Sequence, residues 1–242
     1  MTFSGQCSIC GFRGTFEPVN SSPRDCYPCP ECRFTLRYRD QAAVILDFFG
    51  NGAVESFNKL AAHPSMQEKH IVEFALGGPF IRYLYRLPHY QQAYFFESEE
   101  EKQAQQNKVM HVDIMSMPFD DNSLDLIITS DVLEHVPDVS AALNESRRVL
   151  KPGGVHVFSI PVRYPIPKEN FIRACMREGS IHHIAEPHYH VSGTKGKTLV
   201  FTDFGEEIAT LAEQAGLRLM ISRRSAPIDT CLRNYTFAAI KT

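Results

Sequence analysis

The middle of this 242-residue chain combines short apolar runs with one stretch of helical periodicity. Residues 126–128 and 155–160 are apolar runs too short for a helix, and such runs are typical of strands that both faces of a parallel sheet bury. Between them, residues 139–150 are apolar at every third or fourth position, which predicts a helix. Asp138 occupies the N-cap position, and Pro152 suits the end of the helix. The order strand, helix, strand indicates an open α/β sheet.

Weaker patterns extend this sheet on both sides. Strands are expected at 93–96, 110–114, 217–222 and 235–240, and helices at 42–49 and 54–62. Asp203 and Glu206 are spaced as a helix cap, with Gly216 at the end of that helix. A long irregular segment is expected after 155–160, and loops at the carboxyl ends of strands usually carry substrate contacts. Candidate site residues therefore follow the strands, where open sheets bind their ligands.

The cysteines are concentrated at the N-terminus. Cys7 with Cys10 and Cys29 with Cys32 form two CxxC pairs, and their spacing predicts a tetrahedral four-cysteine zinc ribbon. Four thiolates leave no open coordination position, so the zinc is expected to be structural. Cys26 also forms a CxxC pair with Cys29. We interpret Cys26 as a spare thiol, because C-P-x-C is the usual sequence of a rubredoxin-like knuckle.

Composition sets limits on the organisation and on the partners. The length suits a zinc ribbon at 1–40, a helical linker at 41–65 and one α/β domain at 66–242. A net charge of −3 gives no global basic field for nucleic acid. No apolar stretch reaches the roughly 18 to 20 residues that span a bilayer, and the first residues carry no apolar signal region. We therefore expect a cytoplasmic protein with no membrane partner, and the sequence sets no oligomeric state.

Three motifs carry a family resemblance. The run D-I-x-x-x-P-F-x-D-x-S-x-D begins at Asp113, V-L-E-H-V occupies 132–136, and R-V-L-K-P-G-G occupies 148–154. Together they resemble the class I S-adenosylmethionine-dependent methyltransferases, in particular their small type 11 domain. The resemblance covers 71–162 and implies a Rossmann-like sheet of seven strands with the last strand antiparallel. It also implies S-adenosylmethionine as cofactor and SN2 transfer of its methyl group to an oxygen, nitrogen or carbon nucleophile.

The cofactor loop of the family is altered here. The family pattern is an acid followed by glycines at the second, fourth and sixth places. Glu73 supplies the acid, but Ala75, Gly77 and Pro79 stand at the glycine places. Glycines let the backbone pass close to the ligand, while proline is acceptable in the first turn of a helix. The resemblance therefore implies a loop at Glu73, Ala75 and Gly77 that binds the cofactor in an altered shape or with reduced affinity.

Other strand ends supply further cofactor contacts by the same resemblance. Glu97 is expected to accept both ribose hydroxyls, Asp113 the adenine amino group, and the Ile114 backbone to meet the adenine ring. Ser130 is expected near the sulfonium. Two alternatives remain open, because Glu97 also begins a charged run that caps a surface helix and Asp113 also suits a turn cap.

Histidines gather after the fifth strand. His188 and His190, with His135 in V-L-E-H-V, are the candidate catalytic residues, because histidine titrates near neutrality and can act as a general base. Other interpretations stay open. His135 more often supports the fold in this family, and the histidines of the later segment could instead form structural hydrogen bonds or shape the substrate site. A second metal site would require convergence of His182, His183, His188 and His190, with Glu186 as a further ligand.

The sequence as a whole predicts a methyltransferase with a small-molecule substrate. RNA is the alternative substrate, since some ribosomal-RNA methyltransferases also carry an N-terminal zinc module. A non-catalytic scaffold is the alternative from another class, and the altered loop at 75–79 motivates it.

Overall fold

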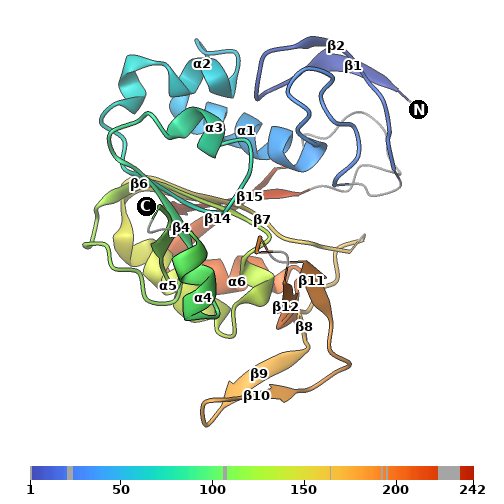
Figure 1. The fold of residues 1–242 in the computed structure, drawn as a ribbon, viewed down its shortest axis with the longest axis vertical. Helices are drawn as coiled ribbons and strands as arrows, with labels where there is room; N and C mark the ends of the chain where they lie inside the picture. Colours follow the sequence, from blue (N-terminus) through green and yellow to red (C-terminus); the bar gives the residue numbers. More distant parts are fainter. Residues whose placement is uncertain are drawn as a thin grey trace.

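The chain folds around one mixed sheet (Figure 1). The computed structural model describes residues 2–20, 24–105, 108–163, 165–191, 193–194, 196–222 and 235–242. Its seven-stranded sheet has the order β14 (Leu217–Ser222), β15 (Thr236–Lys241), β7 (Leu150–Ser159), β6 (Leu124–Ser130), β3 (Ile71–Phe74), β4 (Tyr90–Tyr94) and β5 (Met110–His111). Strand β15 is antiparallel to both neighbours, and β7 to β5 are parallel. The predicted seven-stranded sheet with an antiparallel last strand is confirmed.

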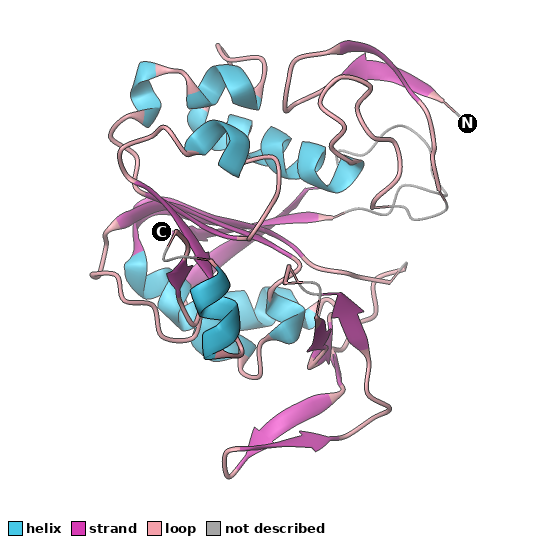
Figure 2. Ribbon diagram, in the orientation of Figure 1, coloured by secondary structure: helices cyan, strands magenta, loops and turns pink. Residues whose placement is uncertain are grey.

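Helices cover both faces of the sheet (Figure 2). One face carries α1 (Leu36–Phe49), α2 (Phe57–Ala61), α3 (Ile81–Leu84) and the short 3-10 helix Pro64–Met66; the other carries α4 (Glu99–Ala104), α5 (Val139–Val149) and α6 (Glu207–Gln214). Strand alternation divides the core between these layers. Ile71 packs with the first set of helices, while Val72 and Phe74 pack with the second. None of the helices in the described residues is long and apolar enough to cross a membrane.

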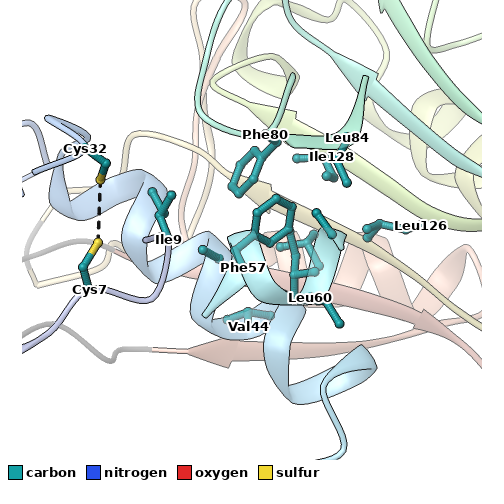
Figure 3. Close-up of a cluster of buried hydrophobic side chains, with 14 of the residues drawn as sticks. Cys7, Ile9, Cys32, Val44, Phe57, Leu60, Phe80, Leu84, Leu126 and Ile128 are labelled. Carbon is teal, nitrogen blue, oxygen red and sulfur yellow. Dashed lines mark hydrogen bonds between the residues drawn. The ribbon is translucent and has the colours of Figure 1, made fainter. Parts of the chain in front are cut away.

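The N-terminal ribbon shares its core with the sheet. It contains the antiparallel hairpin β1 (Phe3–Gln6) and β2 (Arg13–Phe16). Buried Ile9 belongs to one apolar cluster with Phe57 of α2 and Ile128 of β6, as Figure 3 shows. Helix α1 begins at Leu36, inside the range assigned to the ribbon. Ribbon and helices therefore form one continuous layer over the sheet.

Several local predictions are confirmed. Helix α5 begins after Asp138, whose carboxylate accepts a hydrogen bond from the Ala141 N–H at 2.9 Å. Strand β14 has the predicted bounds, and Gly216 before it has a φ of +76°. Strand β4 begins three residues earlier than predicted. Strand β5 has only two residues, because the chain turns at Asp113.

The segment after β7 is not irregular, which corrects the prediction. It forms three two-stranded pairs: β9 (Ala174–Arg177) with β10 (Ser180–His183), β11 (Tyr189–Val191) with β12 (Lys197–Leu199), and β8 (Phe171–Ile172) with β13 (Thr202–Asp203). The predicted cap at Asp203 is wrong. Its carboxylate pairs with Arg173 at 2.7 Å, so the ion pair holds it away from α6.

Candidate active site

The four predicted cysteine ligands converge. The Sγ atoms of Cys7 and Cys32 are 3.8 Å apart, those of Cys10 and Cys29 are 3.6 Å apart, and all four lie within 4.8 Å of one another. A tetrahedral zinc with bonds of about 2.3 Å places its sulfur ligands about 3.8 Å apart. The cluster therefore fits zinc. Cys26 is outside it, with its thiol donating to the Asn20 carbonyl at 3.0 Å.

Both cysteine knuckles have the same backbone geometry. The N–H of Gly11 donates to the Cys7 carbonyl at 2.8 Å, and the N–H of Arg33 donates to the Cys29 carbonyl at 2.9 Å. Gly11 has a φ of +84° and Arg33 a φ of +68°. Arg33 thus adopts the left-handed conformation in which glycine is usual. In each knuckle, the two cysteine thiols therefore point to the same side of the turn, toward the common cluster.

The ribbon layer also reaches the carboxyl end of β6. Arg24 and Arg37 both form ion pairs with Asp131, the residue directly after β6. The Ser159 hydroxyl at the end of β7 donates to the same carboxylate at 3.2 Å. Burial alone would raise the pKa of Asp131, but the charges of Arg24 and then Arg37 outweigh it and hold that pKa below its ordinary value. Asp131 is therefore an anion at the strand end.

Helix α1 contacts the same strand end through Gln41. The Gln41 amide donates to the Thr129 carbonyl at 2.9 Å, and its oxygen accepts from the Ser130 hydroxyl at 2.8 Å. Gln41 is fully buried. Ser130, predicted to lie near the sulfonium, is thus hydrogen-bonded to α1. These bonds fix the position of α1 relative to the end of β6.

The altered loop after β3 is open at its middle glycine. Gly77 is exposed, and a Cβ built on it meets no heavy atom within 4 Å. Gly78 has a φ of +151°, which favours glycine. Pro79 lies just before Phe80, the N-cap of α3, and is therefore outside the helix, where its missing N–H removes no helical hydrogen bond. Ala75 keeps a strand-like hydrogen bond from its N–H to the Ala93 carbonyl at 3.0 Å. The free space beside Gly77 would allow a cofactor to approach the backbone closely.

Glu73 lies beneath this loop. Its carboxyl is buried and accepts a hydrogen bond from the Tyr90 hydroxyl at 2.8 Å. A Cβ on Gly78 would be 3.7 Å from Oε1 of Glu73. Burial raises the pKa of Glu73 to about 8, so the protonated form dominates at neutral pH. The structure places Glu73 as a support of the loop, with its side chain toward Tyr90.

The remaining predicted cofactor residues follow β4 and β5. Glu97 is exposed, three residues after β4, and its N–H donates to the Glu101 carboxylate at 3.1 Å. Asp113 follows β5 and accepts from the Met115 N–H at 2.8 Å, which is the turn cap named as its alternative. Ile114 beside it is buried. Since β4 pairs in parallel with β3 and β5 pairs in parallel with β4, these residues share one edge of the sheet with Gly77.

The three candidate catalytic histidines lie together. His135, in the 3-10 helix η2 (Leu133–His135), has Nε2 3.2 Å from Nδ1 of His190 in β11. The rings of His188 and His190 are 5.0 Å apart. Burial, then the charge of His190, lowers the pKa of His188. Buried Glu134 faces the same group, with Oε1 3.7 Å from Nδ1 of His190.

The alternative metal site, which required these histidines and Glu186 to converge, does not form among the described residues. His182 and His183 are exposed on β10, and Glu186 is exposed beyond it. Of that set, only His190 belongs to a group of ligand atoms within 4.8 Å, and its companions are Glu134 and His135. The β9–β10 hairpin projects away from the sheet (Figure 1), which explains the separation.

The turn between β11 and β12 reaches the cofactor loop. The Gly193 N–H donates to the Tyr94 hydroxyl at 3.1 Å. A Cβ on Gly193 would be 3.3 Å from side-chain atoms of both Leu76 and Tyr94. The Thr194 hydroxyl donates to Glu101 at 2.6 Å. The segment after β7 therefore contacts the loop after β3, the end of β4 and helix α4.

Sequence reasoning missed four residues at this end of the sheet: Arg24, Arg37, Gln41 and Glu134. Glu134 was adjacent to a named candidate in V-L-E-H-V, so the pattern that selected His135 could have included it. Arg24 and Arg37 had no signal of their own, because only the packing of the ribbon on the sheet directs them to Asp131.

Comparisons with known proteins find similarity to methyltransferases. Residues 89–158 match the family described as "Methyltransferase domain". Demethylmenaquinone methyltransferase from Staphylococcus epidermidis is 50% identical over 50 residues, which are 21% of this chain and 21% of the relative. The chain thus matches about a fifth of the length of these curated relatives.

Solved structures of methyltransferases are also similar. An S-adenosylmethionine-dependent methyltransferase from Mesorhizobium loti is 19% identical, with 75% of this chain and 94% of that chain covered and a TM-score of 0.48. A Burkholderia thailandensis 1,6-didemethyltoxoflavin-N1-methyltransferase is 16% identical, with 94% and 95% covered and a TM-score of 0.45. Residues 89–158, which match the methyltransferase domain family, form strands β4, β5 and β6 and most of β7 of the central sheet.

Proposed function

We propose that this protein transfers a methyl group from S-adenosylmethionine to a small-molecule nucleophile. The observation that carries the proposal is the grouping of strand-end residues. Glu97, Asp113 and Ser130 all lie within the matched segment 89–158. Glu97 and Asp113 follow β4 and β5, and Ser130 is the last residue of β6, so all three lie at the carboxyl ends of parallel strands of one sheet. Gly77 lies in the loop after β3, the strand between β4 and β6, and a Cβ built on it meets no heavy atom within 4 Å, so this loop leaves room for a ligand. Ligands of open α/β sheets bind at this edge.

The roles of the residues follow from their positions. When bound, S-adenosylmethionine supplies an electrophilic methyl carbon, and the electrons of the broken C–S bond return to sulfur. Glu97 would hold the ribose hydroxyls, and Asp113 with the Ile114 backbone would hold adenine. Ala75 and Gly77 would line the amino-acid end, with Glu73 supporting them from below. Alignment of this kind can contribute about 7 to 11 kcal/mol to lowering the barrier.

An acceptor that arrives protonated requires a base. His188 is the proposed base, because its ring lies beside that of His190 and desolvation lowers its pKa, which favours the neutral imidazole that can accept a proton. His135 and His190 lie next to it and would orient the acceptor end. An acceptor whose nucleophilic atom carries no proton would not require a base.

A small acceptor is favoured over RNA by the charge distribution. Arg24 of the ribbon and Arg37 of α1 are paired with Asp131 and so are not directed at a phosphate backbone. The net charge of −3 gives no general attraction to nucleic acid. The zinc in the four-cysteine cluster would be structural and would hold these arginines in place.

Calorimetric titration with S-adenosylhomocysteine tests the proposal. We expect saturable one-site binding by the wild type and none by Glu97→Ala. Glu99→Ala is the matched control, because Glu99 is an exposed acid two residues away whose partner is Lys102. Binding that survives Glu97→Ala would refute the ribose role. No binding by folded, zinc-loaded wild type would support the scaffold alternative, and salt-dependent RNA affinity would support the RNA alternative.

A further inference from the structure

A second group of metal-ligating atoms lies at the carboxyl end of β6, apart from the cysteines. Glu134 and His135 belong to η2, and His190 belongs to β11. Nε2 of His135 is 3.2 Å from Nδ1 of His190. Oε1 of Glu134 is 3.7 Å from Nδ1 of His190 and 3.8 Å from Nε2 of His135. The three atoms therefore form a nearly equilateral triangle.

The size of this triangle suits one metal ion. Nitrogen and oxygen ligands about 2.1 Å from a tetrahedral ion lie about 3.4 Å apart. The observed separations of 3.2, 3.7 and 3.8 Å surround that value. Two of them exceed hydrogen-bond length, so direct hydrogen bonds alone do not explain why the carboxylate faces both rings.

The hydrogen bonds of His135 direct its lone pair into the triangle. Its Nδ1 lies 2.7 Å from the Leu199 carbonyl oxygen, which can only accept. Nδ1 therefore carries the proton, and Nε2 presents a lone pair to Glu134 and His190. A metal-bound histidine commonly donates its other N–H to a backbone carbonyl in this way.

Glu134 supplies the independent observation. Its side chain is 1% exposed, and neither carboxylate oxygen has a hydrogen-bond partner among the described residues. A buried carboxyl group without a partner is costly. The negative charge of nearby Asp131 adds to the cost of ionising Glu134. A cation in the triangle would satisfy the exposed lone pairs of Glu134 and both rings together.

We propose that Glu134, His135 and His190 bind a divalent transition-metal ion. Two imidazoles and one carboxylate suit zinc, manganese or ferrous iron better than magnesium or calcium. Three protein ligands leave positions for water or for a donor atom of a second molecule. If the proposed methyl transfer is right, that donor is an oxygen or nitrogen of the acceptor, and His188 stays outside the ligand set as the base. The metal site itself does not depend on the proposed function.

Cobalt substitution separates this site from the cysteine cluster. The full chain, produced with cobalt in the medium, is analysed for metal content and by absorption spectroscopy. Thiolate ligands give intense sulfur-to-cobalt charge-transfer bands, whereas nitrogen and oxygen ligands do not. We expect two cobalt ions per chain in the wild type. Glu134→Gln and His190→Asn should each retain the charge-transfer bands and lose one ion.

The retained bands also report that each variant is folded. His182→Ala is the matched control, because His182 is exposed on β10 and should not affect the count. One cobalt ion in the wild type would overturn the proposal and leave a protonated Glu134 beside a histidine pair. Two ions in both Glu134→Gln and His190→Asn would also overturn it. Loss of the second ion in His182→Ala would place that ion on the surface histidines.

Discussion

The guanidinium of Arg24 donates hydrogen bonds to both carboxylate oxygens of Asp131, 107 positions away in the chain. Arg24 belongs to the ribbon and Asp131 to the carboxyl end of β6. Arg37 of α1 donates to the same carboxylate. The ribbon layer therefore enters the strand-end region directly, and its position affects both stability and the shape of the candidate site.

Asp131→Asn should strongly destabilise the protein. The variant leaves the buried charges of Arg24 and Arg37 without their anion, and loss of one partner from a buried pair costs about 3 to 5 kcal/mol. The free energy of unfolding in urea measures this loss. Asp121→Asn is the control, because Asp121 is exposed and its pair with Arg148 should contribute at most about 1 kcal/mol. Equal losses in the two variants would contradict a buried ion pair.

Cys29→Ser and Cys26→Ser should differ although the residues are three positions apart. Cys29 belongs to the four-cysteine cluster, whereas the Cys26 thiol donates to a backbone carbonyl. We expect Cys29→Ser to lose zinc and Cys26→Ser to keep it, as measured by metal analysis. Because the ribbon shares a core with β6, zinc loss should also lower the melting temperature of the whole chain. Normal zinc content in Cys29→Ser would refute the ligand assignment.

Patterns that depend on neighbouring residues were predictable from the sequence. The cap at Asp138, the buried run of β6 and the CxxC knuckles each arise within a few positions. Interactions between distant segments were not. The ion pair of Asp203 with Arg173 replaced a predicted helix cap, and His190 meets Glu134 only because β11 folds back over η2. Sequence spacing carries no information about such approaches.

The two cysteines outside the ribbon also show that residues without a local motif are hard to place from the sequence. The sequence predicts only an ordinary buried thiol for Cys175, far from the ribbon, and the structure shows it half-buried on β9. Cys231, for which the same was expected, lies outside the described residues. Neither belongs to a motif, so composition alone supported those expectations.

Gly77→Ala should weaken cofactor binding and leave folding unchanged. A Cβ at this position meets no protein atom within 4 Å, so the added methyl has room in the free protein. A ligand that lies against the backbone there would meet it. Titration with S-adenosylhomocysteine should show a large increase in Kd, while the melting temperature stays constant.

Gly78→Ala provides the contrast to that variant. Gly78 has a φ of +151°, a conformation that side chains rarely adopt, so this change should cost stability as well. Unchanged affinity in Gly77→Ala would mean that the cofactor does not pass over this loop.

Glu73→Gln should change how stability depends on pH. Burial raises the pKa of Glu73 from 4.5 to about 8, so the folded state keeps a proton that the unfolded state releases above pH 4.5. The free energy of unfolding should therefore fall as pH rises from 4.5 to 8, by at most about 1.4 kcal/mol per pH unit. Glutamine has no such proton, and its amide oxygen can still accept from the Tyr90 hydroxyl.

Buried His156 acts in the opposite direction, and comparison of variants removes its effect. Burial lowers the pKa of His156 to about 3, so its contribution to stability rises with pH up to its unfolded value of 6.5. His156 is present in both proteins, and the difference between wild type and Glu73→Gln therefore reports Glu73 alone. Urea unfolding at several pH values measures that difference, with Glu99→Gln as an exposed control. A difference that stays constant between pH 4.5 and 8 would mean that Glu73 is ionised in the folded protein.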